Sequence, residues 1–239
     1  MNKSVSSTPG SLRIARAPLI MRLIGKTMAF GYRLLGKDRY DDYRLERING
    51  APFVVMPSVF NPKVPRTGEF LASLIDPDWV KSDWEVLDMG TGSGVCAVFA
   101  AKHARRVVAV DINPAAVRCA RLNVLLNGAE ERIDVRQGDL FDAVADERFD
   151  LILFNPPFLR GAPRDDRDRA WRASDVAERF AAGLRERLKP EGAALVLLST
   201  FGEGGNFLDE FYKQGLGVEM FAERRFVNET LTVFKLVRY

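Results

Sequence analysis

The chain has 239 residues, 47% of them hydrophobic and 28% charged, which is enough apolar material for a folded core and excludes a wholly disordered chain. Its two cysteines are too few for a disulfide-rich secreted scaffold, and its single histidine excludes a Cys/His zinc cluster. No segment reaches the roughly 18 apolar residues of a membrane span. We therefore expect a cytoplasmic protein with one large domain and an appendage.

The net charge of +3 is unevenly distributed along the chain. Residues 1–37 contain seven basic and no acidic residues, whereas the remainder contains 28 basic and 32 acidic residues. Apolar and basic residues at loosely helical spacing predict a basic N-terminal helical extension over residues 1–50, followed by the main domain over residues 51–239. The extension could pack on the body, bind an acidic partner such as RNA or a membrane surface, or act as a targeting segment.

From Trp84 onward, short apolar runs alternate with amphipathic stretches. Strands are predicted from Val86, at Arg106–Val110, Ile133–Arg136, Phe149–Phe154, Ala193–Leu198, Val218–Arg225 and Leu231–Tyr239. Helices are predicted at Val95–Lys102, Asn113–Leu126 and Val176–Leu188. This alternation predicts an α/β fold with a doubly wound sheet, and the last two strands predict an antiparallel edge hairpin.

A glycine-rich loop, DMGTGSG at Asp88–Gly94, stands between the first of these strands and the following helix. Glycines allow a tight turn and close approach of a ligand to the main chain. Asp111 ends the next strand, 23 residues beyond Asp88, where a carboxylate suits the two hydroxyls of a ribose. We therefore expect a nucleoside-containing ligand at this edge of the sheet.

Two features favour S-adenosylmethionine over a nicotinamide dinucleotide as that ligand. The dinucleotide pattern G-x-G-x-x-G needs a glycine at position 95, where the chain has Val95. The acid at the loop entrance, Asp88, suits a cation with an amino group better than it suits a pyrophosphate. The acidic turn Gly138–Leu140 could accept a hydrogen bond from an adenine amine.

The tetrad Asn155–Phe158, NPPF, follows the fourth strand. Two prolines make the backbone rigid and remove two N–H donors. The Asn155 side-chain oxygen and the Pro156 carbonyl could then accept the two hydrogens of a planar amine, so that positioning supplies most of the rate. Phe158 could stack on the planar group and exclude water. The other interpretation is a turn that ends the strand, with Phe158 covering the core.

The series Asp88–Gly94, Asp111, Asp139 and Asn155–Phe158 resembles the class I S-adenosylmethionine-dependent methyltransferases of the amino-methylating branch, which includes the HemK-type enzymes. The resemblance covers about residues 59–239 and implies a seven-stranded Rossmann-like sheet with a reversed last strand. Residues 59–62 and 66–71 resemble the segment that covers the cofactor in HemK-like enzymes. The cofactor contacts implied or predicted are Thr67, Asp88, Gly90, Gly92, Gly94, Asp111, Ile112, Asp139, Leu140 and Asn155.

The resemblance implies N-methylation of a planar nitrogen in a protein, peptide, nucleobase or small molecule. Asn155, Pro156 and Phe158 are the predicted catalytic residues, and Pro157, Arg160 and Trp171 the predicted acceptor contacts. Where HemK-type enzymes carry two glycines, this chain has Arg172 and Ala173, which departs from the release-factor pattern. Two alternatives are a methyltransferase-like binding module docked by its basic extension and a nicotinamide oxidoreductase on the same sheet.

Overall fold

A computed structural model describes residues 42–63, 66–157, 159–160, 172–200, 202, 204–227 and 229–238. The greater part of the predicted N-terminal extension, residues 1–41, lies outside the described residues, as do Phe158 and Trp171. Within the described part of the chain, no helix combines the length and apolarity needed to cross a bilayer.

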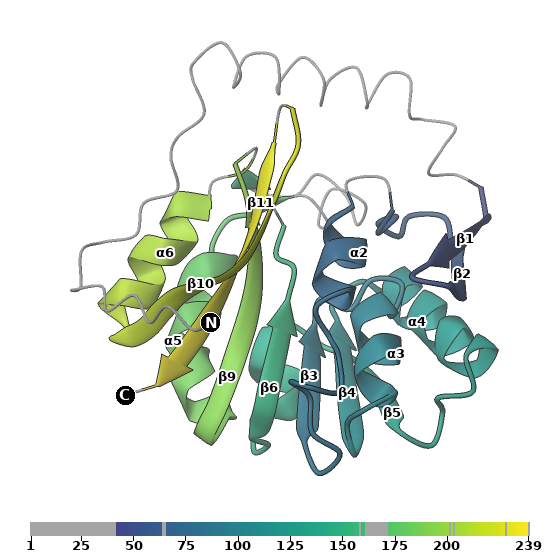
Figure 1. Cartoon of the computed structure of the whole chain (residues 1–239), viewed down its shortest axis with the longest axis horizontal. Helices are drawn as coiled ribbons and strands as arrows, with labels where there is room; N and C mark the ends of the chain where they lie inside the picture. Colours follow the sequence, from purple (N-terminus) through teal and green to yellow (C-terminus); the bar gives the residue numbers. More distant parts are fainter. Residues whose placement is uncertain are drawn as a thin grey trace.

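Seven strands form one mixed sheet in the order β10-β11-β9-β6-β3-β4-β5. Figure 1 shows the strands across the width of this sheet. Their bounds are β3 Glu85–Met89, β4 Arg106–Asp111, β5 Ile133–Gln137, β6 Phe149–Phe154, β9 Leu188–Ser199, β10 Leu216–Arg225 and β11 Thr230–Arg238. The first five are parallel, and β11 runs antiparallel between β9 and β10. The predicted doubly wound sheet, its terminal hairpin and its reversed last strand are confirmed.

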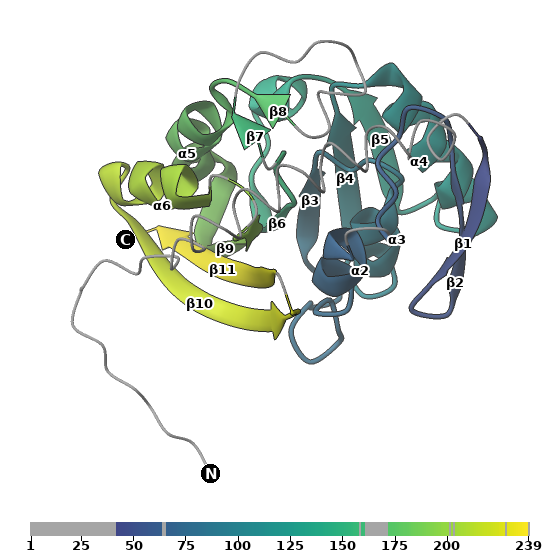
Figure 2. The ribbon, with the colours of Figure 1, turned by 90° about the horizontal axis from the view of Figure 1, so that it is seen from above.

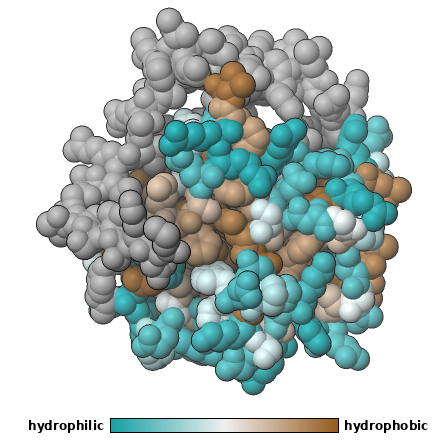
Figure 3. Space-filling view, viewed as in Figure 1, coloured by the Kyte–Doolittle hydropathy of each residue, from teal (hydrophilic) through white to brown (hydrophobic). Residues whose placement is uncertain are grey.

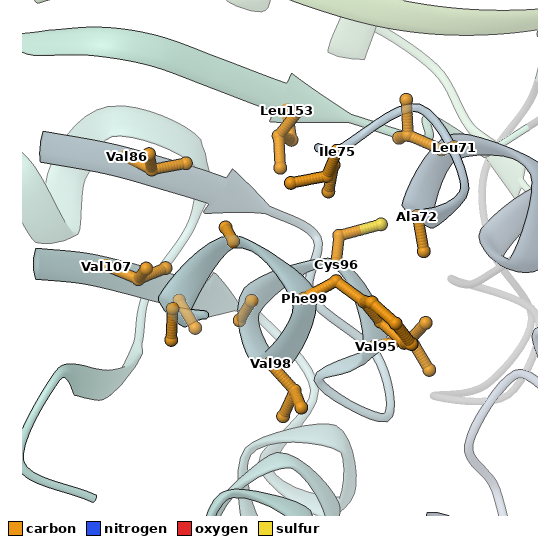
Figure 4. Close-up of a cluster of buried hydrophobic side chains, with 14 of the residues drawn as sticks. Leu71, Ala72, Ile75, Val86, Val95, Cys96, Val98, Phe99, Val107 and Leu153 are labelled. Carbon is orange, nitrogen blue, oxygen red and sulfur yellow. The ribbon is translucent and has the colours of Figure 1, made fainter. Parts of the chain in front are cut away.

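Helices cover both faces of this sheet (Figures 1 and 2). One face carries α2 (Thr67–Ala72), α3 (Val95–Ala101) and α4 (Pro114–Leu126), and the other carries the 3₁₀ helix η2 (Leu140–Val144), α5 (Val176–Arg187) and α6 (Gly204–Lys213). The central strands are therefore apolar on both sides. Figure 4 shows the first face, where Ile75 and Cys96 meet Leu153 of β6.

Residues 44–55 form a β-hairpin of β1 (Arg44–Ile48) and β2 (Ala51–Val55). Its turn, Asn49-Gly50, has positive φ at both residues, which matches the right-handed twist of the two strands. Asn123 of α4 anchors the hairpin, because its amide both accepts from the Val54 N–H and donates to the Val54 carbonyl, at 2.7 Å each. The prediction of helix up to residue 50 is thus wrong for residues 44–48, which form a strand.

The β10–β11 hairpin leans on α2 at the carboxyl edge of the sheet. The Arg224 guanidinium lies 4.5 Å from the centre of the Phe70 ring, and Arg66 lies 5.6 Å from that of Phe226. These two contacts connect the hairpin to α2. Val227, shortly after β10, is fully exposed. In the view of Figure 3, apolar residues lie among mostly polar ones on the described surface.

The glycine-rich stretch after β9 is not the turn that its composition suggests. Gly204 and Gly205 open α6, and Phe207 and Phe211 bury one face of that helix against Phe180 of α5. The spacing of these two aromatic residues is helical, and it outweighs the low helix propensity of the glycines.

Candidate functional site

A pocket of about 260 Å³ opens at the carboxyl ends of β3, β4 and β6. Its walls come from the loop after β3, the ends of β4 and β6, the turn after β5 and the start of α5. In a parallel α/β sheet this edge, where the strand order reverses, is the usual place for a ligand. The segment predicted to cover the cofactor contributes Val59, Phe60 and Pro62 to the same pocket.

The three glycines of the loop after β3 all have positive φ, between 57° and 81°. Gly90 and Gly92 line the pocket, so a ligand can approach their main chain closely. Gly94, the third, is the N-cap of α3, and a Cβ there would lie 3.2 Å from the Ala120 Cα. The structure therefore gives Gly94 a packing role between α3 and α4, and it is not among the residues that line the pocket.

Asp88 ends β3 with a carboxylate that is only 3% exposed. Its Oδ2 accepts from the Thr91 hydroxyl at 2.6 Å and from the Ala97 N–H at 3.0 Å. Burial raises the pKa of Asp88 to about 7, and these two hydrogen bonds oppose that rise. The Oδ2 atom of Asp88 thus holds the glycine loop by hydrogen bonds. Asp88 also lines the pocket, where a bound cation would favour the ionised carboxylate.

Asp111, at the end of β4, connects the same loop to the next strand. Its Oδ2 accepts from the Gly92 N–H at 2.8 Å, and its Oδ1 accepts from the Asn113 N–H at 2.9 Å. Burial raises the pKa of this carboxyl as well, against the effect of its backbone donors. Each oxygen keeps further lone pairs, so the carboxylate is rigidly placed and can still accept from two hydroxyls.

At the far end of the pocket, the turn after β5 brings Asp139 beside Arg179 of α5. The Arg179 Nη1 donates to the Asp139 Oδ2 at 2.8 Å. This hydrogen bond raises the pKa of Arg179. Sequence reasoning predicted Asp139 and Leu140 here and missed Arg179, Ser174, Asp175 and Val176, which also line the pocket. No local sequence pattern indicates these residues, because only the tertiary packing of α5 brings them to the pocket.

Asn155 follows β6 on the face that α2 covers, as expected from its alternation with the buried Leu153. Its Nδ2 donates to the Thr67 hydroxyl at 3.2 Å, whereas its Oδ1 is buried with no partner among the described residues. Thr67 is fully buried and is not among the pocket-lining residues. Thr67 therefore orients the Asn155 amide, and the oxygen that remains is a ready acceptor at the pocket edge.

Pro156 and Pro157 line the pocket beside Asn155, as predicted for the tetrad. Arg160 belongs to β7 (Leu159–Arg160), whose backbone pairs with β8 (Arg172–Ala173). The roles predicted for Arg160, Phe158 and Trp171 in binding the acceptor stay predictions.

The charged side chains around the pocket fit a cationic nucleoside ligand. In the described part of the chain they are four carboxylates and one guanidinium, namely Asp88, Asp111, Asp139, Asp175 and Arg179. This balance disfavours a pyrophosphate and suits a ligand with a positive charge and several N–H or O–H donors. S-adenosylmethionine has a sulfonium, an amino group, two ribose hydroxyls and an adenine amine, so the residues present fit it.

Comparison with known proteins identifies the family. Residues 51–224 match the model of the methyltransferase small domain. The chain belongs to the methyltransferase small domain family. The predicted resemblance to S-adenosylmethionine-dependent methyltransferases of the amino-methylating branch is thereby confirmed.

Relatives of this chain include two proteins that are named glutamine methyltransferases. The chain is 34% identical over 194 residues to a ribosomal protein uL3 glutamine methyltransferase of Bradyrhizobium diazoefficiens, covering 70% of this chain and 58% of that one. It is 30% identical over 200 residues to a putative protein N5-glutamine methyltransferase of Methanocaldococcus jannaschii, covering 80% of this chain and 98% of that one. The chain thus spans little more than half of the first relative and nearly all of the second.

The fold has solved counterparts. A T. thermophilus 16S rRNA N2-guanosine methyltransferase, solved with AdoMet and guanosine, superposes with a TM-score of 0.62 at 24% identity, over 82% of this chain and 50% of that one. This likeness supports the class I methyltransferase architecture.

Proposed function

We propose that the protein is an S-adenosylmethionine-dependent N-methyltransferase that acts on a planar nitrogen bearing two hydrogens. The observation that carries the proposal is the Asn155 amide, whose nitrogen is held by Thr67 and whose buried oxygen is unpartnered within the described residues. A buried acceptor without a partner is costly, so such an atom at a pocket edge points to a ligand donor.

Asp88, Asp111 and Asp139 would hold the cofactor by its amino group, ribose and adenine, respectively. Bound there, S-adenosylmethionine supplies an electrophilic methyl group. Asn155 Oδ1 and the Pro156 carbonyl accept the two N–H groups of the acceptor, and this geometry withdraws the nitrogen lone pair from conjugation. The rigid Asn-Pro-Pro backbone holds both acceptors in place, so the chain contributes orientation rather than proton transfer.

The acceptor class that the relatives favour is a glutamine side-chain amide in a protein. Both glutamine methyltransferases cited above act, by their names, on this group, and an amide nitrogen has the two hydrogens that the site can accept. A nucleobase exocyclic amine has the same geometry and is the second candidate, favoured by the guanosine of the structural relative. The basic residues in segment 1–37 would then contact an acidic surface, such as RNA, that is associated with the acceptor.

Transfer of labelled methyl groups into fractionated lysate tests the proposal, with wild type compared with Asn155→Ala. We expect label in the protein fraction for wild type and a loss of kcat on the order of a hundredfold for the variant, because one preorganised contact is removed. Affinity for S-adenosylhomocysteine should change much less.

Asn155→Asp is the matched control, because it keeps an oxygen in the Oδ1 position and should retain more activity than Asn155→Ala. Equal turnover by wild type and Asn155→Ala would contradict the role assigned to the amide. Label confined to RNA would move the acceptor to a nucleobase.

A further inference from the structure

The ion pair between Asp139 and Arg179 crosses the rim of the pocket at the end away from Asn155. The two residues are 40 positions apart, one in the turn after β5 and one in the first turn of α5. Both side chains are partly open to the pocket, with 38% and 40% of their surface exposed. Both line the pocket.

Folding alone does not require this pair. The turn is already fastened to α5 by Phe141, whose ring stacks on Phe180 with centroids 5.4 Å apart. It also packs against Gly183, where a Cβ would come within 2.6 Å of the Phe141 ring. An ion pair this exposed contributes little to folding stability. Its place at the pocket rim therefore calls for another explanation.

The backbone beside the pair is strained. Leu140 has φ 50°, a left-handed conformation that is unfavourable for a non-glycine residue. The preceding Gly138 has no room for a side chain, since a Cβ would lie 2.5 Å from that of Ala143. Strain of this kind concentrates where a ligand is held. The turn thus presents Asp139 in one backbone conformation, and Arg179 holds its carboxylate.

The remaining oxygen of Asp139 defines what the site accepts. Arg179 engages Oδ2, and no described residue donates to Oδ1. A carboxylate oxygen accepts hydrogen bonds and cannot donate them. An exocyclic amine on a purine matches such an acceptor, whereas a carbonyl at the same position would face it with like partial charge.

We propose that Arg179 is a positioning residue that orients the Asp139 carboxylate toward the adenine amine and so sets the purine specificity of the pocket. The inference rests on the proposed function, because it takes the cofactor to be an adenosine derivative. It assigns to α5, which follows the acceptor tetrad in the chain, an indirect part in recognising the cofactor, through Asp139.

Calorimetric titration with two probes tests this role. S-adenosylhomocysteine carries the amine, and S-inosylhomocysteine carries a carbonyl in its place. Wild type should prefer the first. Arg179→Ala should lower affinity for S-adenosylhomocysteine about tenfold, as expected for one charge-assisted hydrogen bond, and affinity for the inosine compound far less. Arg179→Lys, which keeps the charge without the planar fork, should recover part of the preference.

Arg185→Ala is the matched control, because Arg185 lies on the same helix and does not line the pocket. It should leave both affinities unchanged. An equal fall for both probes in Arg179→Ala, or no fall for either, would overturn the inference and leave the proposed function standing. Failure of wild type to bind either probe would overturn both.

Discussion

The two halves of the pocket differ in how their polar atoms are satisfied. In the cofactor half, the carboxylates of Asp88 and Asp111 accept from the hydroxyl and N–H groups of their own loops. In the acceptor half, the Asn155 oxygen has no partner among the described residues. The carboxylates of the first half are thus held by the protein itself, whereas under the proposed function the acceptor would supply the donor that Asn155 lacks.

This difference teaches how one fold can serve many acceptors. A preorganised cofactor half depends on a few local segments that close on one another. Under the proposed function, the acceptor half needs a rigid hydrogen-bond acceptor, which the Asn155 oxygen provides.

The largest effect should come from the buried charge of Asp88. Because burial raises its pKa to about 7, the folded state binds the proton more tightly than the unfolded state between about pH 4 and 7. Ionised Asp88 therefore lowers the free energy of unfolding progressively as pH rises through this window, a loss that is complete above pH 7. Asp88→Asn removes that penalty and keeps an oxygen that can accept from Thr91.

Urea unfolding at pH 5 and pH 8 measures the effect. The stability of Asp88→Asn relative to wild type should rise by about 3 kcal/mol between these pH values. In wild type, affinity for S-adenosylmethionine should increase through pH 7 as the carboxylate ionises, and in the variant it should be weaker and flat. A relative stability independent of pH would show that Asp88 is not a strained charge in the free protein.

A matched pair of glycines in the loop after β3 separates ligand contact from packing. Gly94→Ala combines a φ of 81° with a Cβ only 3.2 Å from Ala120, and should lower the free energy of unfolding by about 2 kcal/mol or more. At Gly92 φ is 57°, and an added Cβ would have no atom within 4 Å. Gly92→Ala should therefore lower the free energy of unfolding by only about 1 kcal/mol.

For S-adenosylhomocysteine binding the order should reverse, because Gly92 lines the pocket and Gly94 does not. Urea unfolding and calorimetry on both variants make the comparison. If Gly94→Ala lowered the affinity for S-adenosylhomocysteine more than Gly92→Ala does, the predicted role of Gly94 as a cofactor contact would be favoured over a packing role.

The cofactor half was predictable because its signals are local. The loop Asp88–Gly94, the acid Asp111 and the turn at Asp139 each stand directly after a strand, and parallel strands end at the same edge. The partners of these residues were not predictable in the same way. Arg179 lies 40 residues from Asp139, and only the packing of α5 on the turn brings them together.

Two elements escaped prediction. The helical extension was predicted to continue to residue 50, although Asn49-Gly50 is a strong hairpin signal between two short runs. The glycines at the start of α6 indicate a turn, although Phe207 and Phe211 have helical spacing. In α6, burial of these two rings outweighed local propensity.

The smallest effect should come from Thr67, which holds the Asn155 amide. Removing its hydroxyl in Thr67→Val keeps the shape but leaves the Asn155 Nδ2 without its acceptor, so the amide can turn its nitrogen toward the substrate. We expect kcat to fall about tenfold, the equivalent of one hydrogen bond, with little change in affinity for S-adenosylhomocysteine. Thr67→Ser restores the hydroxyl and should restore kcat.

Steady-state kinetics beside calorimetry distinguish this positioning role from two others. If Thr67 only supported the fold, thermal stability would fall in Thr67→Val and the serine variant would not selectively recover kcat. If Thr67 contacted the cofactor, as its likeness to the HemK-type segment implies, affinity would fall as far as kcat. A selective loss of kcat follows only if the hydroxyl acts through Asn155, because a fully buried side chain outside the pocket can reach the acceptor by no other described contact.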